Sequence, residues 1–193
     1  MIEPNFSGKV IIVSAPSGAG KTTLVKRLLN SNLPIEFSIS ACNRNPRENE
    51  TDKKDYYFLS TEEFKSKIKW NKFIEWEEVY PNNFYGTLKE EINRIWNLNK
   101  HVIFDVDVVG GISLKKYFSK NALSIFIKPP SLEELSKRLK KRNTESTQSL
   151  KTRLEKSNNE MKYLYKYDQI IENDNLDIAS QKIREIVKTF LEN

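Results

Sequence analysis

Short, continuously apolar runs alternate along the chain with stretches that place an apolar residue every three or four positions. The continuous runs are typical of buried parallel strands, and the periodic stretches are typical of helices that cover a sheet. The predicted strands are 9–14, 101–106, 123–127 and 168–171. The predicted helices are 22–30, 88–98, 111–118, 131–142, 148–163 and a last one with an apolar stripe from Ile178 to Leu191. This alternation predicts an α/β fold, a parallel sheet with helices on both faces.

Residues 37–86 interrupt this alternation. Polar loops and one short helix after Ser60 separate three pieces with strand-like composition there, at 37–40, 56–58 and 73–80. We interpret 37–86 as an inserted, mostly β subdomain. At the start of the helix over 131–142, Ser131 and Glu134 have the spacing of a capping box, which marks a helix N-terminus.

Residues 138–158 are strongly charged and poor in large apolar side chains, which predicts a mobile helical lid. The rest of the chain would form the core of the same domain. We therefore predict one domain over all 193 residues. Its core is 1–36, 87–137 and 159–193.

Composition narrows the class of protein. Hydrophobic residues make up 38% and charged residues 30%, an ordinary globular composition, and no apolar run approaches the ~20 residues of a membrane-spanning helix. The single cysteine, Cys42, has no partner for an internal disulfide, so we expect a cytoplasmic protein without a membrane partner. The net charge of +6 raises the question of nucleic acid, but the lysines are spread out and no aromatic-basic signature accompanies them. We expect no nucleic-acid partner.

A phosphate-binding loop follows the first predicted strand. Residues 14–23 read S-A-P-S-G-A-G-K-T-T, which fits the P-loop pattern G-x-x-x-x-G-K-[ST] except that Ala15 replaces the first glycine. Glycines let consecutive N–H groups point at one anion, Lys21 adds a charge for the β and γ phosphates, and Thr22 offers a hydroxyl to Mg²⁺. A turn that binds nothing is the alternative, disfavoured by the strand before and the helix after. We expect a negative φ at Ala15. The predicted ATP-binding residues here are Ala15, Pro16, Ser17, Gly18, Ala19, Gly20, Lys21, Thr22 and Thr23.

Two carboxylates, Asp105 and Asp107, end the strand predicted over 101–106. Ligands bind at this edge of parallel sheets, and an ATP site needs a carboxylate to order the water around Mg²⁺. A helix cap or turn is the alternative for either residue, and we favour a functional role for at least one. Thr22 and Asp105 are the predicted Mg²⁺ site, largely through water.

A chain of short motifs then identifies a family. Residues 38–50 read S-I-S-A-C-N-R-N-P-R-E-N-E, followed by D-Y-Y-F at 55–58, F-I-E-W at 73–76 and Y-G-T at 85–87. This order is similar to the GMP-binding segment of guanylate kinases, S-x-T-T-R-x-P-R-x-x-E, D-Y-x-F, F-[IL]-E and Y-Y-G-[ST]. The resemblance covers nearly the whole chain. It implies an enzyme that transfers the γ-phosphoryl group of ATP to GMP or dGMP with Mg²⁺.

The resemblance implies a role for each matching residue of the acceptor segment. Arg44 and Arg47 would grip the GMP phosphate, and Tyr56 and Tyr85 would donate hydroxyl hydrogen bonds to it, which suits a dianion. A carboxylate can accept from guanine N1–H and the 2-amino group together, a donor pair that adenine lacks. Surface charge for the arginines and a salt bridge for the glutamate are the alternatives. The residues implied to face guanine are Ser40, Glu75, Thr87 and Asp107.

Some positions depart from the family pattern. Cys42 and Asn43 stand where the family has two threonines, Lys53 replaces a glycine, and Val109 replaces a glutamine. These departures concern supporting hydrogen bonds. We interpret Cys42 as a packing residue, because no histidine that could activate it lies nearby, and His101 is the only histidine.

The lid of the family has arginines at positions that match Arg138, Arg142 and Arg153. Phosphoryl transfer needs positive charge around the transferred group and exclusion of water, and a closing flap with arginines supplies both. Salt bridges to neighbouring glutamates are the alternative. Together with Lys21 and Arg44, these three are the predicted catalytic residues. By the same resemblance, Asn173 and Asp174 would border the adenine pocket.

Three other functions compete with this hypothesis. Another nucleoside monophosphate kinase should lack the set of Ser40, Glu75 and Thr87, and a non-catalytic guanylate-kinase-like interaction domain usually has a degraded P-loop. A P-loop GTPase would need an N-K-x-D motif, which this sequence lacks. The predicted small-molecule partners are ATP and GMP, and no pattern assigns a protein partner.

Overall fold

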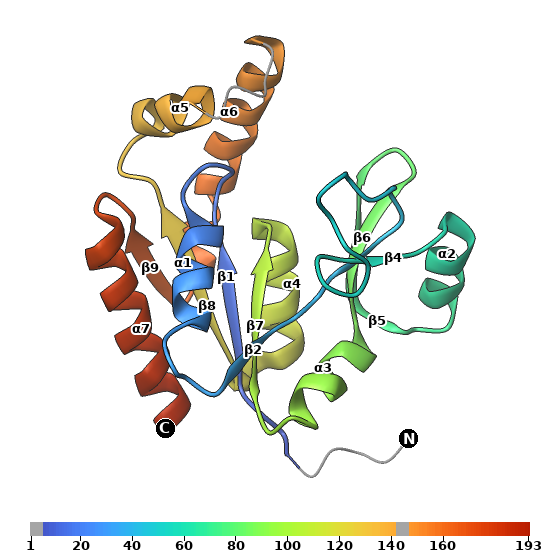
Figure 1. The fold of residues 1–193 in the computed structure, drawn as a ribbon. Helices are drawn as coiled ribbons and strands as arrows, with labels where there is room; N and C mark the ends of the chain where they lie inside the picture. Colours follow the sequence, from blue (N-terminus) through green and yellow to red (C-terminus); the bar gives the residue numbers. More distant parts are fainter. Residues whose placement is uncertain (1–5, 142–146) are drawn as a thin grey trace. The chain divides into compact units, whose positions relative to one another are not determined.

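The computed structural model describes residues 6–141 and 147–193 (Figure 1). The chain forms two compact units. The first, the insert unit, contains residues 6–8 and 34–102, and the second, the core unit, contains 9–33 and 103–193. Strand β7 (His101–Val106) passes from one to the other. The predicted P-loop and Asp105 lie in the core unit, and Arg44, Glu75 and Thr87 lie in the insert unit.

A sheet with parallel strand pairs organises the core unit. The strand order of this sheet is β2-β7-β1-β8-β9, where β1 is Val10–Ser14, β8 is Ala122–Lys128 and β9 is Gln169–Glu172. The edge strand β2 (Ile35–Phe37) comes from residues of the insert unit. Strand β8 pairs in parallel with both β1 and β9. All five residues of β1 are buried, as expected of an apolar run at the centre of a sheet. The four strands predicted from the apolar runs are thus confirmed.

Helices cover this sheet. Helix α1 (Lys21–Leu29) packs against α7 (Leu176–Glu192), and α4 (Val108–Phe118) packs on β1 and β8 from the other face (Figure 1). The apolar stripe predicted for the last helix is confirmed for Ile183 and Val187, which are fully buried. Ile178 is the exception, with 68% of its surface exposed. The remaining elements of the unit are η1 (Ser119–Asn121), α5 (Leu132–Lys141), α6 (Thr147–Met161) and η2 (Leu164–Lys166).

Side-chain caps set where two core helices begin. Ser131 Oγ accepts from the Glu134 N–H at 3.1 Å, so the predicted N-terminus of α5 is confirmed. Helix α4 begins at Val108, three residues before the predicted start at 111, because Asp107 Oδ1 accepts from the Gly110 N–H at 2.7 Å.

The insert unit has a small mixed sheet of its own. The order β4-β3-β6-β5 joins one parallel pair, β3 with β4, to antiparallel pairs on the other side. Besides β2, the elements of this unit are β3 (Ala41–Cys42), β4 (Tyr57–Phe58), α2 (Thr61–Lys69), β5 (Phe73–Tyr80), β6 (Asn83–Leu88) and α3 (Lys89–Trp96).

Two sequence predictions need comment in this unit. The helix expected after Ser60 is confirmed, and Ser60 and Glu63 form a complete capping box. The strand predicted over 37–40 is wrong, because the strand covers Ile35–Phe37 and residues 38–40 have no strand pairing. The reason is that the Ile39 N–H donates to the carboxylate of Glu91 and not to a neighbouring strand.

Aromatic side chains form the core of the insert unit. The rings of Phe64 and Phe73 stack with centroids 4.4 Å apart, and Phe84 stacks on Phe64 at 5.6 Å. Ala41 and Leu88 complete this buried cluster. It fixes α2 on the sheet through a few large contacts, as aromatic pairs do in small cores.

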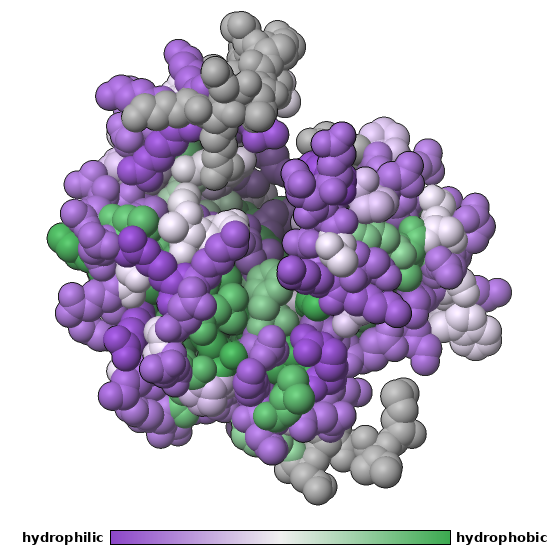
Figure 2. Space-filling model, viewed as in Figure 1, coloured by the Kyte–Doolittle hydropathy of each residue, from purple (hydrophilic) through white to green (hydrophobic). Residues whose placement is uncertain are grey.

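Hydrophilic residues cover most of the molecular face drawn in Figure 2. Among the described residues, no helix is both long and apolar enough to cross a membrane.

Candidate nucleotide-binding sites

The P-loop of the core unit connects β1 to α1 with the expected backbone. Gly18 and Gly20 have φ of 92° and 93°, the left-handed region that favours glycine. Ala15 is absent from the described residues with positive φ, as expected. Gly20 is the N-cap of α1 and has no side chain with which to cap it. The first N–H groups of α1 are therefore available to an anion at the loop.

Lys21, Thr22 and Asp105 meet beside this loop. Lys21 Nζ lies 2.7 Å from Asp105 Oδ1 and donates to the Val106 carbonyl at 2.6 Å. Thr22 Oγ1 donates to Asp105 Oδ2 at 2.9 Å. The end of β7 therefore carries a carboxylate that orients both the cation and the hydroxyl of the P-loop. The Mg²⁺ site predicted for Thr22 and Asp105 remains a prediction.

Asp107 is used differently. Its Oδ1 caps α4, and its carbonyl accepts from Ser14 Oγ at 3.0 Å. The helix cap considered as the alternative is thus present in the structure. A contact of Asp107 with guanine remains a prediction.

Helix α5 supports the P-loop from one side. Leu135 and Leu139 are buried against Gly18, where an added Cβ would lie 2.9 Å from Leu139 Cδ2. The buried Asn173 side chain donates from Nδ2 to the Ala19 carbonyl at 2.8 Å. Arg138 Nη1 in turn donates to the Asn173 carbonyl at 3.1 Å. The P-loop, the segment after β9 and the first lid arginine are thereby joined in one hydrogen-bonded chain.

The predicted lid arginines differ in what the structure shows of them. Arg138 lies on α5, next to Asn173, and also donates from Nε to Glu134 Oε1 at 3.3 Å. Arg153 is exposed on α6. Arg142 lies outside the described residues.

In the insert unit, Arg44 is held on several sides. Nη1 and Nη2 donate to the two oxygens of Glu50 at 2.6 and 2.7 Å, and Nε donates to Tyr85 Oη at 3.0 Å. The guanidinium also lies 5.0 Å from the ring centroid of Tyr56. The Arg44 hydrogen bonds lower the pKa of Glu50 to about 2 and raise the pKa of Arg44 above its ordinary value. Arg47 adds its N–H to Glu50 Oε2 at 2.9 Å, and its side chain is exposed.

The residues implied to face guanine include a pair on the insert sheet. Glu75 on β5 and Thr87 on β6 are opposite each other, and Thr87 Oγ1 donates to Glu75 Oε1 at 2.7 Å. Thr87 is fully buried. The Thr87 hydroxyl therefore fixes the position of one oxygen of the Glu75 carboxylate. Ser40, on the loop before β3, accepts through its carbonyl from the Tyr57 N–H at 2.9 Å.

Comparisons with known proteins agree with this geometry. Residues 7–190 match the family model described as guanylate kinase. The chain belongs to the guanylate kinase family. It is 50% identical to a guanylate kinase of Porphyromonas gingivalis, with 95% of this chain and 98% of that protein covered. It is 46% identical to one of Bacteroides thetaiotaomicron, with 96% and 91% covered. The crystal structure of guanylate kinase from Anaplasma phagocytophilum has a TM-score of 0.77 and 28% identity over 97% of this chain and 88% of that one.

The structure describes the surroundings of three departures from the guanylate kinase pattern. Asn43 ties three segments together, because Nδ2 donates to Thr61 Oγ1 and to the Asn82 carbonyl, both at 2.8 Å, while Oδ1 accepts from the Phe84 N–H. Lys53 has a φ of 61°, the conformation for which the family's glycine is suited. Val109 is half exposed at the start of α4.

Cys42 is fully buried on β3, and its burial raises the pKa of the thiol. A buried, protonated thiol is a poor nucleophile. This supports the interpretation of Cys42 as a packing residue.

Two acidic residues of this family member were not singled out by sequence reasoning. Glu50 closes the motif that contains Arg44, so its place at the end of that motif was the available signal. Glu91 is a glutamate inside the apolar stripe of α3, next to Ile92 and three residues before Arg94. A charged residue on a buried helix face with an opposite charge one turn away is the signal that could have identified it.

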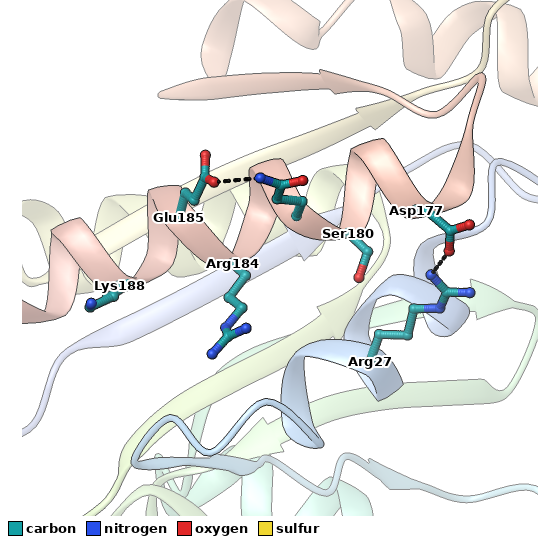
Figure 3. Close-up of a pocket in the computed structure, with 7 residues that line it drawn as sticks. Arg27, Asp177, Ser180, Arg184, Glu185 and Lys188 are labelled. Carbon is teal, nitrogen blue, oxygen red and sulfur yellow. Dashed lines mark hydrogen bonds and ion pairs between the residues drawn. The ribbon is translucent and has the colours of Figure 1, made fainter.

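A hollow of about 590 Å³ lies between α1 and α7 on the core unit (Figure 3). Arg27 on α1 pairs with Asp177 on α7, and Gln181 Nε2 donates to Glu185 Oε1 at 3.0 Å. None of the predicted site residues lines it. The residues that do are Arg27, Asp177, Ser180, Gln181, Arg184, Glu185 and Lys188. Its charges are largely balanced within the two helices, which favours a role in their packing.

Proposed function

We propose that this guanylate kinase family member transfers the γ-phosphoryl group of ATP to GMP, and also to dGMP, and releases ADP and the nucleoside diphosphate. The observation that carries the proposal is the intact donor cluster of Lys21, Thr22 and Asp105 at the P-loop. A non-catalytic interaction domain has no need of a lysine and a hydroxyl oriented by one carboxylate. The cluster therefore favours the enzyme over that alternative.

On the donor side, Lys21 and the N-terminal N–H groups of α1 would bind the β and γ phosphates of ATP. Asp105 Oδ1 pairs with Lys21 at the loop where the phosphates would bind, while Oδ2 accepts from Thr22. Asn173 and Arg138 keep the loop in place through the Ala19 carbonyl. When ATP binds, Lys21 would exchange its ion pair with Asp105 for one with the phosphates, while the backbone of the loop would change little. The further residues assigned to this side are Ala15, Pro16, Ser17, Gly18, Gly20 and Thr23.

Thr22 Oγ1 and Asp105 Oδ2, 2.9 Å apart, are oxygen ligands of the type that Mg²⁺ prefers. In the described part of the chain, no group of three or more acidic, histidine or cysteine side chains gathers as a metal cage. Mg²⁺ that keeps several waters and takes the rest of its ligands from nucleotide phosphates fits this sparse set. When bound, the ion would neutralise charge on the transferred phosphoryl group.

On the acceptor side, Arg44, Arg47, Tyr56 and Tyr85 would bind the phosphate of GMP. Glu50 pre-orients the Arg44 fork, so part of the entropic cost of fixing a long side chain is met before GMP arrives. The GMP phosphate is already an anion and needs no general base to attack the γ-phosphorus. The chain's task is then to align the two phosphates and to exclude water.

Base selectivity would rest on Glu75, oriented by Thr87, with Ser40 and Asp107 completing the guanine site. A carboxylate facing adenine would meet N1, an acceptor, and would lose both donors of guanine. A buried acceptor left without donors is strongly disfavoured, which supports discrimination of several orders of magnitude between the bases.

The lid arginines Arg138, Arg142 and Arg153 would supply positive charge to the transferred group and shield it from water. Closing over bound nucleotides would make this charge available only when both substrates are present. A cytoplasmic location, expected from the single cysteine, fits substrates of this kind.

Coupled assays of ADP formation test the proposal. GMP and dGMP should support turnover, whereas AMP and UMP should give kcat/KM values lower by at least about 10³-fold, because a site built to bind the guanine donors leaves its buried polar groups unpaired with other bases. Comparable kcat/KM with AMP would refute the assignment to GMP. Lack of turnover with all four acceptors would favour the non-catalytic alternative.

A further inference from the structure

Glu91 is a buried carboxylate at the centre of the insert unit. Its side chain on α3 has no exposed surface, a rare environment for a charged group unless it is well paired. Oε1 accepts from the Ile39 N–H and from Arg94 Nη2, both at 2.8 Å. Oε2 accepts from Tyr57 Oη at 2.7 Å and from Arg94 Nε at 2.9 Å. Four donors therefore share the two oxygens, and the carboxylate is fully satisfied.

The donors come from segments that carry predicted GMP contacts. Ile39 directly precedes Ser40, which is assigned to guanine, and Tyr57 directly follows Tyr56, which is assigned to the phosphate. The Tyr57 N–H also donates to the Ser40 carbonyl at 2.9 Å. Glu91, Ile39, Ser40 and Tyr57 thus form a closed ring of covalent and hydrogen bonds.

The ring replaces secondary structure that this segment lacks. Residues 38–40 lie outside a strand, and the bond from the Tyr57 N–H to the Ser40 carbonyl joins them to the start of β4. The position of their backbone therefore also depends on the bond from the Ile39 N–H to Glu91. Arg94 adds to these by donating from Nη2 to the Phe37 carbonyl at 3.3 Å. Desolvation by burial and the bond to Glu91 raise the pKa of Tyr57 to about 12, so the phenol remains a donor at neutral pH.

We propose that Glu91 is a positioning residue for GMP, which sets the separation between the Ser40 contact with the base and the Tyr56 contact with the phosphate. The proposal rests on the function proposed above. A role confined to stability would not require that both bonded residues adjoin predicted GMP contacts, one for each end of the same ligand. Glu91 itself touches neither.

The test compares Glu91→Gln with Tyr57→Phe and with Glu90→Gln. An amide has one oxygen and one NH₂ group, so whichever way it turns, the NH₂ group faces an N–H of Arg94, which cannot accept a hydrogen bond. Glu91→Gln should raise the KM for GMP by about tenfold or more, while kcat and the KM for ATP change less than about twofold. Tyr57→Phe removes one bond and keeps the Arg94 pair, so it should raise the KM for GMP by about threefold. Glu90, exposed on the same helix, is the matched control and should leave all three constants unchanged.

Thermal unfolding and calorimetric titration with GMP alone complete the test. If Glu91→Gln lowers Tm but leaves the Kd for GMP at the wild-type value, Glu91 is only a stability residue and the inference is overturned. The same holds if kcat falls, or the KM for ATP rises, in step with the loss of GMP affinity. Should Glu91→Gln fail to fold, an unchanged GMP affinity in Tyr57→Phe overturns the inference by itself. Failure of the proposed function is distinguishable, because the wild-type protein would then give no turnover with GMP.

Discussion

Lys53 occupies a backbone conformation that a glycine would adopt without strain. Its φ of 61° lies in the left-handed region, where a side chain costs about 1 kcal/mol relative to glycine. Lys53→Gly should therefore stabilise the protein by about 0.5–1 kcal/mol, less whatever glycine adds to the entropy of the unfolded chain. Urea unfolding monitored by tryptophan fluorescence measures the change.

Lys54 provides the control for this prediction. It is exposed in the same turn but is absent from the described residues with positive φ. Lys54→Gly should leave stability unchanged or lower it, because glycine brings only its entropic cost there. Equal effects of the two substitutions would show that backbone strain at Lys53 is not the cause.

The Arg44–Glu50 pair makes stability depend on pH in a defined range. The pKa of Glu50 is lowered from an ordinary 4.5 to about 2 in the folded state, so its contribution is complete above pH 4.5 and is lost as pH falls toward 2. Glu50→Gln should be less stable than wild type at pH 6, and the difference in the free energy of unfolding should shrink steadily below pH 4.5. Urea unfolding at a series of pH values measures both curves.

Glu48→Gln is the matched control, because Glu48 lies in the same loop and is exposed. Its difference from wild type should be small and should not change with pH. A constant difference between wild type and Glu50→Gln down to pH 3 would contradict the lowered pKa. Glu50→Gln should also raise the KM for GMP, because Arg44 then loses the carboxylate that orients it.

At the level of elements, the sequence was most informative where local and tertiary signals agree. Strands β1 and β8 are apolar because both of their faces are buried. Each of the four core strands was predicted within a residue or two of its observed ends, including β9, of which only Ile171 is buried. The P-loop was predictable because its residue types match its conformation. Gly18 and Gly20 stand where φ is positive, and a buried strand and a helix flank the loop. The start of α4 was predicted three residues too late because Asp107, the N-cap of this helix, was interpreted as a ligand-binding residue.

The insert was harder to predict because its strands are short and depend on side chains far away in sequence. Strand β3 contains two residues, and no period-2 pattern can be recognised over that length. The 38–40 segment is held by Glu91, more than fifty positions later, so its apolar-polar alternation suggested a strand that does not form. The paired hydrogen bonds between Arg44 and Glu50 could not be predicted either, because a motif gives the residue types and not which of them interact.

At the scale of the whole molecule, the two units hold different predicted tasks. The core unit carries the donor cluster around Lys21, and the insert unit carries the acceptor cluster around Arg44. Within the core unit Lys21 is held by Asp105 and the Val106 carbonyl, and within the insert unit Arg44 is held by Glu50 and Tyr85, so each cluster has supporting contacts of its own. Binding of one nucleotide should then survive loss of the other cluster, while catalysis should need both.

This division predicts opposite kinetic signatures for Lys21→Ala and Arg44→Ala. Lys21 meets charge that builds on the donor phosphates in the transition state, so its loss should lower kcat by about 10²–10³-fold and leave the Kd for GMP within about twofold of wild type. Arg44 holds the acceptor phosphate in the ground state, so Arg44→Ala should raise the KM for GMP by at least about tenfold, more than the loss of an exposed ion pair would explain. Arg44→Lys should restore only part of the affinity, because an ammonium group cannot reproduce the bidentate fork. Steady-state kinetics with calorimetric titration of GMP on each variant decides the matter, with Lys26→Ala, an exposed lysine on α1, as the control that should match wild type. If Lys21→Ala kept more than a tenth of the wild-type kcat, or if Arg44→Ala bound GMP normally, the separation of tasks between the two clusters would be wrong.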